Sequence, residues 1–349
     1  MNRLKWLVIF VGFCSALNAQ IKDEAYYFDI SKALGYYYGV ELSNNLIQEK
    51  FRDLAQKSMM AQLKFSLAHE KSVDVMESEI ASYLEVTRSE FREHVISKAF
   101  SQLGIESLSY AEASAFLNNF EDERIFGRHE LYKEFVQILL SHNPDYKNYP
   151  IKEFLDDYRD ILSSSNHPKG RGLDLTMEYP LSWSAQEGKR PNVLKLVRSK
   201  DKSCGFSIII KDILKMIGVE ESTLNREDRK YFLSGQFAKE FFDEEVNYNY
   251  GKEMMIGMGF EEYSNFSFDK TKIDGQDAAV VKATGILNRG GIELKVHSIN
   301  YIVVYKNYMI NLGFMINSFE NNLPKEQRKY EVLCEQIAAS MIFVDKWRD

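Results

Sequence analysis

Apolar residues recur every three to four positions through the first half of the chain, which is the spacing of amphipathic helices. The longest such stripe runs over 44–68 and includes Met59, Leu63 and Leu67. A helix normally buries its apolar stripe, so this spacing places these side chains in a core. A second stripe covers 76–84.

Two sequence patterns mark helix starts. Thr87 with Glu90, and Ser109 with Glu112, have the spacing of capping boxes, in which the two side chains satisfy the first free backbone groups of a helix. Gly104 is expected to end the helix that Thr87 opens. Further helices are expected over 131–139 and from Pro150 to about 161. Residues 20–162 are therefore predicted to form an all-α bundle.

The pattern changes after the segment 163–172, which contains no apolar residue and is predicted to be a linker. Beyond it apolar residues alternate with a period of two, as in strands with one buried face. Asp274-Gly275 and Gly290-Gly291 have the composition of tight hairpin turns. The expected strands are 173–179, 193–197, 206–210, 263–272, 277–287, 292–305 and 308–316, with helices over 225–245 and 326–343. The predicted fold class is α+β: a helical bundle followed by an antiparallel sheet sandwiched by helices over 173–349.

The first nineteen residues have the three parts of an export signal. Arg3 and Lys5 form a basic start, 6–13 form a short apolar run, and small residues up to Ala19 offer a cleavage site. An uncleaved anchor, or a lipoprotein modified at Cys14, is the alternative. We expect export to the periplasm or the extracellular space, with no stable membrane insertion after cleavage.

Composition narrows the function class. The 349 residues contain 44 Lys+Arg and 51 Asp+Glu, a net charge of −7. A general nucleic-acid binder needs a basic surface, so this class is not expected.

One local motif resembles a known family. The run Glu178-Tyr179-Pro180-Leu181-Ser182-Trp183 is similar to the opening of PsbP-like domains, and the expected order of strands and helices after it is also similar. The resemblance covers about 170–349. The stretches 167–170 and 187–192 also resemble uncharacterised secreted bacterial proteins with a helical first half. The PsbP-like resemblance implies a protein-binding or assembly role without catalysis.

Gly35 and Gly39 are four residues apart in an early expected helix, a spacing that lets two helices approach closely. The segment is similar to the dimerisation arm of periplasmic FKBP-type isomerases and suggests a homodimer. The alternative is a tightly packed pair of helices within one chain.

Motifs for enzymatic chemistry are absent from the sequence. It has no zincin helix, no Cys-x-x-Cys, no phosphate-binding glycine loop and no Gly-x-Ser-x-Gly elbow. We therefore expect no cofactor, no metal and no catalysis. An unrecognised hydrolase built on His129 or His297 remains an alternative.

Two segments are candidates for binding. Residues 248–260 are apolar and rich in methionine where a polar connection is expected, and Met and Tyr make adaptable contact surfaces. Trp183 with Arg190 and Asn192 forms a second candidate rim, since Trp and Arg are enriched in binding hot spots. Within 248–260 the candidates are Tyr248, Tyr250, Met254, Met255, Met258 and Phe260. The alternatives are a segment folded onto the sheet, and a tryptophan that caps the core.

Two cysteines, Cys204 and Cys334, lie outside the signal. They could form a disulfide in an oxidising compartment, or be small buried residues, and the sequence leaves both open.

The leading hypothesis is an exported, non-enzymatic binding or assembly module that contacts a protein of the bacterial envelope. The alternative is a carrier of a small apolar ligand.

Overall fold

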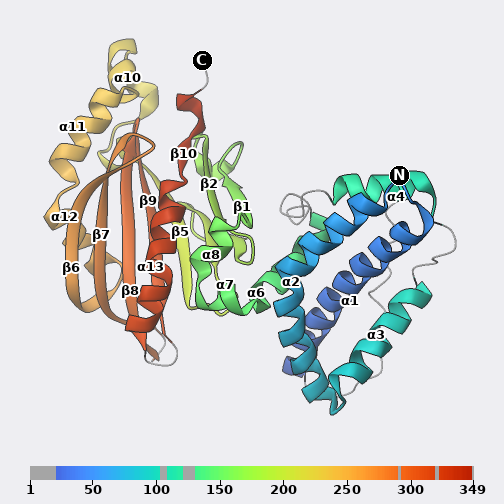
Figure 1. Ribbon diagram of the computed structural model, residues 1–349. Helices are drawn as coiled ribbons and strands as arrows, with labels where there is room; N and C mark the ends of the chain where they lie inside the picture. Colours follow the sequence, from blue (N-terminus) through green and yellow to red (C-terminus); the bar gives the residue numbers. More distant parts are fainter. Residues whose placement is uncertain (1–20, 103–107, 121–129, 290–291, 319–321, 348–349) are drawn as a thin grey trace. The chain divides into compact units, whose positions relative to one another are not determined.

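The computed structural model describes residues 21–102, 108–120, 130–289, 292–318 and 322–347, and the chain forms two compact units (Figure 1). Unit 1 comprises the chain up to Asn148 together with Asp156–Tyr158, and unit 2 comprises Tyr149–Leu155 and Arg159–Asp349. The predicted export signal lies outside the described residues. The fold class is α+β, as expected.

Unit 1 is helical. Asn44 on the first helix and Ser58 on the second are in contact, since the Ser58 hydroxyl lies 2.9 Å from both the backbone oxygen and the Oδ1 of Asn44. The segment 44–68 is therefore two antiparallel helices joined by a turn, and the single helix predicted there is wrong. The described helices are α1 (Ile21–Lys50), α2 (Ala55–Leu84), α3 (Arg88–Gln102), α4 (Tyr110–Asn119), α6 (Glu130–His142) and α7 (Pro144–Asn148).

Both predicted capping boxes are confirmed. The Thr87 backbone N–H donates to the Glu90 carboxylate at 2.8 Å, and the Glu90 N–H donates to the Thr87 hydroxyl at 3.2 Å. Ser109 and Glu112 make the same reciprocal pair at the start of α4. Gly104 lies outside the described residues.

Unit 2 is built on a seven-stranded antiparallel sheet of order β3-β4-β5-β9-β8-β7-β6. The predicted four-strand meander is confirmed, and Asp274 and Gly275 turn between its first two strands with positive φ of 46° and 73°. Gly290-Gly291 lies outside the described residues. The strands are β3 (Ser184–Glu187), β4 (Val193–Arg198), β5 (Cys204–Asp212), β6 (Phe260–Ile273), β7 (Gln276–Arg289), β8 (Ile292–Tyr305) and β9 (Tyr308–Asn317).

Helices cover both faces of this sheet (Figure 1). On one face lie α11 (Gly235–Glu245) and α12 (Tyr248–Gly257), and on the other lies α13 (Leu323–Ala339). The short helices α9 (Ile213–Met216) and α10 (Arg226–Phe232) precede α11. The helix predicted over 225–245 is in fact α10 and α11, because the Ser234 side chain accepts from the Phe237 N–H and starts a new helix.

The predicted linker 163–172 lies inside unit 2. The helix that begins at Pro150 is α8 (Pro150–Leu155), and the chain then forms β1 (Arg159–Ser163) instead of continuing as a helix to 161. β1 pairs with β2 (Leu175–Pro180), which also pairs with β10 (Ile342–Phe343) in a small second sheet.

Side chains of this segment bond to other parts of unit 2, which explains how it folds there: His167 contacts Glu187 at 2.9 Å, and Arg171 donates to Asn192 at 2.8 Å. Ser164 is buried, and its hydroxyl donates to the Leu173 carbonyl at 2.6 Å. A Cβ on Gly170 would lie 2.6 Å from the Ser164 carbonyl oxygen, so only glycine fits there.

Candidate functional site

The apolar segment predicted as a connection over 248–260 forms helix α12 and the start of β6. Asn247 caps the helix, because its Oδ1 accepts from the N–H groups of Asn249 and Tyr250 at 3.0 and 3.1 Å. The residues that suggested a contact surface therefore repeat at helical spacing.

Most of these residues pack against the sheet. Met255 and Phe260 are buried, and the Tyr250 hydroxyl donates to the Met309 sulfur at 3.3 Å. Met254 and Met258 are partly buried against the same core, and only Tyr248 among the candidates is exposed. The interpretation of 248–260 as an exposed apolar contact surface is wrong for this reason: apart from Tyr248 and Ile256, its large apolar side chains pack between α12 and the sheet.

The residues of the second candidate rim differ in exposure: Trp183 is buried and Arg190 is not. Trp183 is 2% exposed and belongs to the core on the α13 face, with ring centroids 6.3 Å from Phe206 and 6.2 Å from Tyr330. Arg190 is exposed, and the Asn192 Oδ1 accepts from the Arg171 guanidinium at 2.8 Å. Trp183 therefore caps the core, and it does not share an exposed surface with Arg190.

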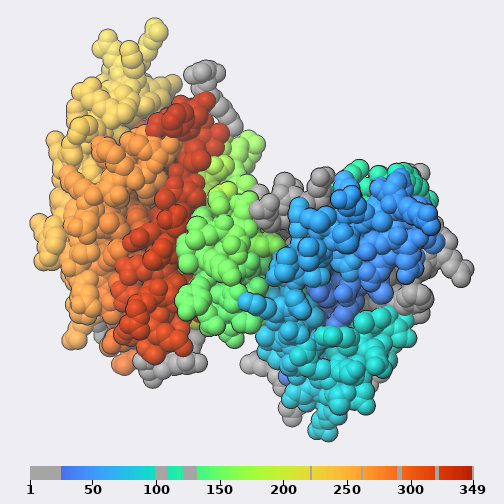
Figure 2. Space-filling model, viewed as in Figure 1, coloured from blue at the N-terminus to red at the C-terminus, as the bar shows by residue number. Residues whose placement is uncertain are grey.

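An exposed apolar surface lies elsewhere, on α2, where the sequence pattern places core residues. Four large apolar side chains, here called the α2 stripe, are about half exposed or more: Met59 (54%), Met60 (47%), Leu63 (51%) and Leu67 (72%). The opposite side of this part of the helix is buried and largely polar, with Ser58, His69 and Ser72 beside Phe65. Figure 2 shows α2 at the surface of unit 1. The signal that could have revealed this is that Ser58, His69 and Ser72 share one side of the helix, opposite the stripe.

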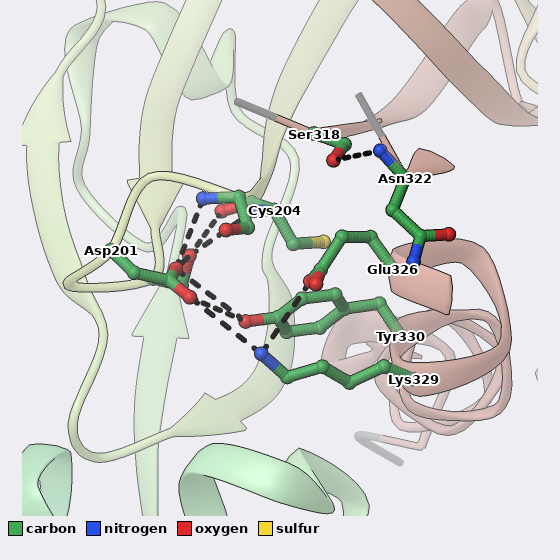
Figure 3. Close-up of polar contacts among 9 residues, drawn as sticks. Asp201, Cys204, Ser318, Asn322, Glu326, Lys329 and Tyr330 are labelled. Atoms are coloured by element: carbon green, nitrogen blue, oxygen red, sulfur yellow. Dashed lines mark hydrogen bonds and ion pairs between the residues drawn. The ribbon is translucent and has the colours of Figure 1, made fainter. Parts of the chain in front are cut away.

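A polar cluster surrounds the turn between β4 and β5 (Figure 3). The Asp201 carboxylate accepts from the Ser199 hydroxyl at 2.6 Å and from the Ser203 N–H at 3.0 Å. From α13, the Tyr330 hydroxyl donates to the same carboxylate at 3.3 Å, and the Lys329 ammonium lies 3.6 Å from it. Burial raises the pKa of Asp201, but these hydrogen bonds and the charge of Lys329 outweigh it and leave that pKa lowered. Asp201 is thus an ionised anchor for α13.

Cys204 follows this turn directly, and its Sγ lies 3.9 Å from the Sγ of Cys334 on α13. Both thiols are buried. Burial raises the pKa of the Cys204 thiol well above its usual value, and the neighbouring Cys334 thiol adds to this. A reactive cysteine needs an accessible thiolate, so this pair is not built for nucleophilic catalysis.

His297, one basis of the hydrolase alternative, is also buried. Its Nδ1 lies 3.0 Å from the Thr284 hydroxyl, and its Nε2 lies 3.5 Å from the Gln327 amide nitrogen. Burial lowers the pKa of His297, so the imidazole is neutral at pH 7. Because Thr284 is buried as well, this hydroxyl–imidazole pair is closed off from solvent. His129 lies outside the described residues.

Gly35 and Gly39 lie in a stretch of α1 that is buried continuously from Ala33 to Val40. Tyr36 and Tyr37 on this stretch stack against Phe135 and Phe65, at centroid distances of 5.5 and 5.2 Å. These tyrosines therefore contact other helices of the same chain, whereas a Cβ on Gly39 would meet nothing within 4 Å, and the homodimer stays a prediction.

The described residues contain neither a membrane-spanning helix nor a metal-binding cluster. Within the described ranges no helix combines the length and apolar character needed to cross a bilayer. The same residues contain no group of three or more His, Cys, Asp or Glu side chains placed to hold a metal ion.

Comparisons with known proteins leave the family open. No family model and no curated protein matches the sequence. Among solved structures, a protein from Bacteroides thetaiotaomicron aligns with 15% identity and a TM-score of 0.26, covering 48% of this chain and 44% of that one. LpqN from Mycobacterium tuberculosis, described as involved in cell envelope biogenesis, aligns with 11% identity and a TM-score of 0.27, over 56% of this chain and 96% of its own. A Pseudomonas aeruginosa protein of unknown function aligns with 9% identity and a TM-score of 0.25, covering 52% of this chain and 96% of that one. Scores this low carry no argument about function.

Proposed function

We propose that this protein is an exported, non-enzymatic binding module of the bacterial envelope, which binds a partner protein through the α2 stripe. The observation that carries the proposal is the reversed amphipathicity of the first half of α2. Between Ser58 and Ser72 the large apolar side chains of the α2 stripe face solvent, while Ser58, His69 and Ser72 lie on the buried face beside Phe65. The export component rests on the signal pattern of residues 1–19.

The orientation of α2 is set by specific polar contacts, and this makes the exposure meaningful. The Ser58 hydroxyl bonds to Asn44 across the helix pair, and the buried side-chain amide of Asn143 donates to the Ala68 carbonyl of α2 at 3.3 Å. Rotating α2 to bury its apolar stripe would break these contacts and leave buried polar groups unpaired, which costs free energy. The stripe is therefore held outward.

The spacing of the stripe fits a helical partner. Met59, Leu63 and Leu67 are one helical turn apart and span about 12 Å along the axis. Apolar side chains at such intervals are the usual contacts between two amphipathic helices, and methionine adapts to irregular surfaces. A surface of this kind is rare on proteins that have no partner.

Charge along one edge indicates the chemistry of that partner. Lys57, Lys64 and Lys71 follow each other at seven-residue spacing and so line a single side of the stripe. Lys71 is exposed and pairs with Asp145 at 2.8 Å. We propose that the partner presents an amphipathic helix whose apolar face is bordered by acidic residues, which would steer and orient it.

The unit 2 fold supports a related proposal, that residues 170–349 form a PsbP-like domain. The strands β2 to β5, the helices α9 to α12, the four-strand meander and the C-terminal helix α13 follow in an order similar to that of the resemblance seen at Tyr179-Pro180 and Trp183, with β3 as a short strand that the resemblance did not include. Known PsbP-like proteins bind proteins, so this proposal is consistent with a binding role for the whole chain.

The test is site-specific photo-crosslinking in intact cells, with a photoreactive amino acid at position 60. We expect an adduct with an envelope protein, and we expect Leu63→Glu with Leu67→Glu to reduce its yield about tenfold or more. The matched control is Ile256→Glu, since Ile256 on α12 is 64% exposed but lies in unit 2.

The outcomes separate the hypotheses. Equal loss with the Ile256 variant, or no adduct at position 60, would contradict the α2 stripe as the binding surface. An adduct with twice the mass of the chain would show self-association and replace the envelope partner by a second copy. Circular dichroism of each variant checks that unit 1 remains folded.

A further inference from the structure

Two cysteines that are 130 residues apart in the sequence meet in the core of unit 2. Cys204 is the first residue of β5 and Cys334 lies on α13, and their sulfur atoms are 3.9 Å apart. Both side chains are buried, at 1% and 0% exposure. They are also the two cysteines that remain once the predicted signal is removed.

The backbone on each side of this contact is held in place. The Cys204 N–H donates to the Ser199 hydroxyl at 3.1 Å, and the Ser199 N–H donates to the Cys204 carbonyl at 2.9 Å. On α13, Tyr330 and Lys329 bind Asp201 in the same turn (Figure 3). The turn that positions Cys204 thus also anchors the helix that carries Cys334, so their approach is set by the surrounding contacts.

We propose that the exported protein carries a disulfide between Cys204 and Cys334. This inference rests on the export component of the proposed function, because disulfides persist in oxidising compartments. A disulfide bond is about 2.05 Å long, so the sulfur atoms must approach by roughly 2 Å, which side-chain rotation and a small shift of α13 can provide.

The oxidant is a protein disulfide of an envelope thiol oxidase. The thiolate of one cysteine attacks the oxidant's disulfide, which forms a mixed disulfide and releases one oxidant thiolate. The thiolate of the second cysteine then attacks the mixed disulfide and displaces the second oxidant sulfur. The chain loses two S–H bonds and gains one S–S bond, while two electrons reduce the oxidant to a dithiol. Because both thiols are buried in the folded unit, this exchange belongs to the stage before α13 docks on the sheet.

The bond would connect the β4–β5 end of the sheet to the C-terminal helix. It would close a long loop that includes β5–β9 and most of the helices of unit 2. In the chain-entropy description, closing such a loop lowers the entropy of the unfolded chain and so raises the melting temperature. Reduction should therefore lower the melting temperature of unit 2 by about 5–15 °C.

The first arm of the test uses the mature chain, reduced, unfolded and then refolded in a mixture of reduced and oxidised glutathione. After thiol alkylation and trypsin digestion, we expect peptides 203–211 and 330–346 to appear joined by a disulfide. The melting temperature should fall with reductant in the wild-type protein and be unaffected by it in Cys204→Ala/Cys334→Ala. A folded wild-type chain that alkylates fully at both positions overturns the inference.

The second arm uses the native protein, isolated from cells after acid quenching and alkylation. The joined peptides in both arms support the proposal. A disulfide formed with glutathione but absent from the native protein overturns the claim for the exported chain, and it identifies export as the component that failed. If the double alanine variant does not fold, the single variant Cys334→Ala, which must be equally insensitive to reductant, replaces it.

Discussion

Glu153 on α8 shows how one buried carboxylate organises its surroundings. Its two oxygens accept from the Ser182 N–H and from the Ser182 hydroxyl, both at 2.7 Å. Ser182 precedes Trp183, so these bonds hold the turn that places the indole in the core. Burial raises the pKa of Glu153 to about 7, although the bonds from Ser182 act in the opposite direction.

The raised pKa makes a prediction about stability and pH. Below the unfolded pKa of about 4.3, Glu153 is protonated in both states and contributes no pH dependence. Between about 4.3 and 7 the unfolded chain releases the proton while the folded chain retains it, so this group makes the protein less stable as pH rises. Glu153→Gln keeps the shape and cannot ionise.

The stability of Glu153→Gln relative to wild type should therefore increase by about 3 kcal/mol from pH 4 to pH 8. Urea unfolding followed by tryptophan fluorescence at several pH values measures this difference. A difference that does not change with pH would show that the pKa of Glu153 is the same in the folded and unfolded protein, and so that burial does not raise it.

Among the elements, α12 depends on a glycine at its contact with the sheet. A Cβ on Gly251 would lie 3.2 Å from the Phe268 ring and 3.3 Å from both Phe266 and Val281. The helix therefore approaches the sheet closely enough for Met255 and Tyr250 to pack on either side of this point.

We expect Gly251→Val to lift α12 and to destabilise unit 2 by about 1–3 kcal/mol, since extra methyl groups in a filled core force neighbours apart. The matched control is Gly257→Ala at the end of the same helix, where a Cβ meets nothing within 4 Å. It should leave stability unchanged or slightly higher, because alanine favours helix over glycine. Thermal unfolding of the two variants tests this, and similar losses in both would contradict the packing role of Gly251.

At the scale of the whole molecule, each unit has its own set of hydrogen bonds around a buried carboxylate. In unit 1 the buried Glu77 accepts from the Arg92 guanidinium at 2.6 and 2.8 Å, from Arg88 at 2.9 Å, and from the Tyr38 hydroxyl. Burial raises the pKa of Glu77, but these hydrogen bonds outweigh burial and leave that pKa lowered. Glu77 is thus ionised, and the stability it contributes is present above the unfolded pKa and lost as pH falls through the folded one.

Glu77→Gln removes the buried charge but leaves two arginines facing it, which should destabilise unit 1 by about 3 kcal/mol at pH 7. Circular dichroism at 222 nm should show an earlier helical transition. Tryptophan fluorescence should be unchanged, because Trp183 and Trp347 both belong to unit 2. Asp74→Asn, on an exposed residue of α2, is the control. A matching shift in both signals would show that the units unfold together.

Local signals account for the parts of the fold that were predicted. The Thr87 and Ser109 capping boxes and the Asp274-Gly275 turn involve residues a few positions apart, so their geometry follows from the sequence near them. The alternation of the last four strands predicted their pairing, because consecutive strands joined by tight turns form antiparallel neighbours. In contrast, β10 is only two residues long and pairs with β2 from the other end of unit 2, and β1 is a five-residue strand in a segment with the apolar spacing of a helix, so nothing local marks either strand.

The candidate site was less predictable, because exposure depends on residues distant in sequence. An apolar stripe has the same pattern whether it faces a core or a partner, and only the packing of α1 against α2 decides that Met59, Leu63 and Leu67 face outward. The same reason places Met255 and Trp183 in the core.

The sequence by itself determined the fold class and the antiparallel meander of the last four strands, since periodicity and turn chemistry act over a few residues, and it contains two cysteines beyond the predicted signal. Only the tertiary structure decided which apolar faces are buried, where unit 1 ends, and that Cys204 meets Cys334. Those properties depend on contacts between segments as far as 130 residues apart, which chain topology brings together and local pattern does not encode.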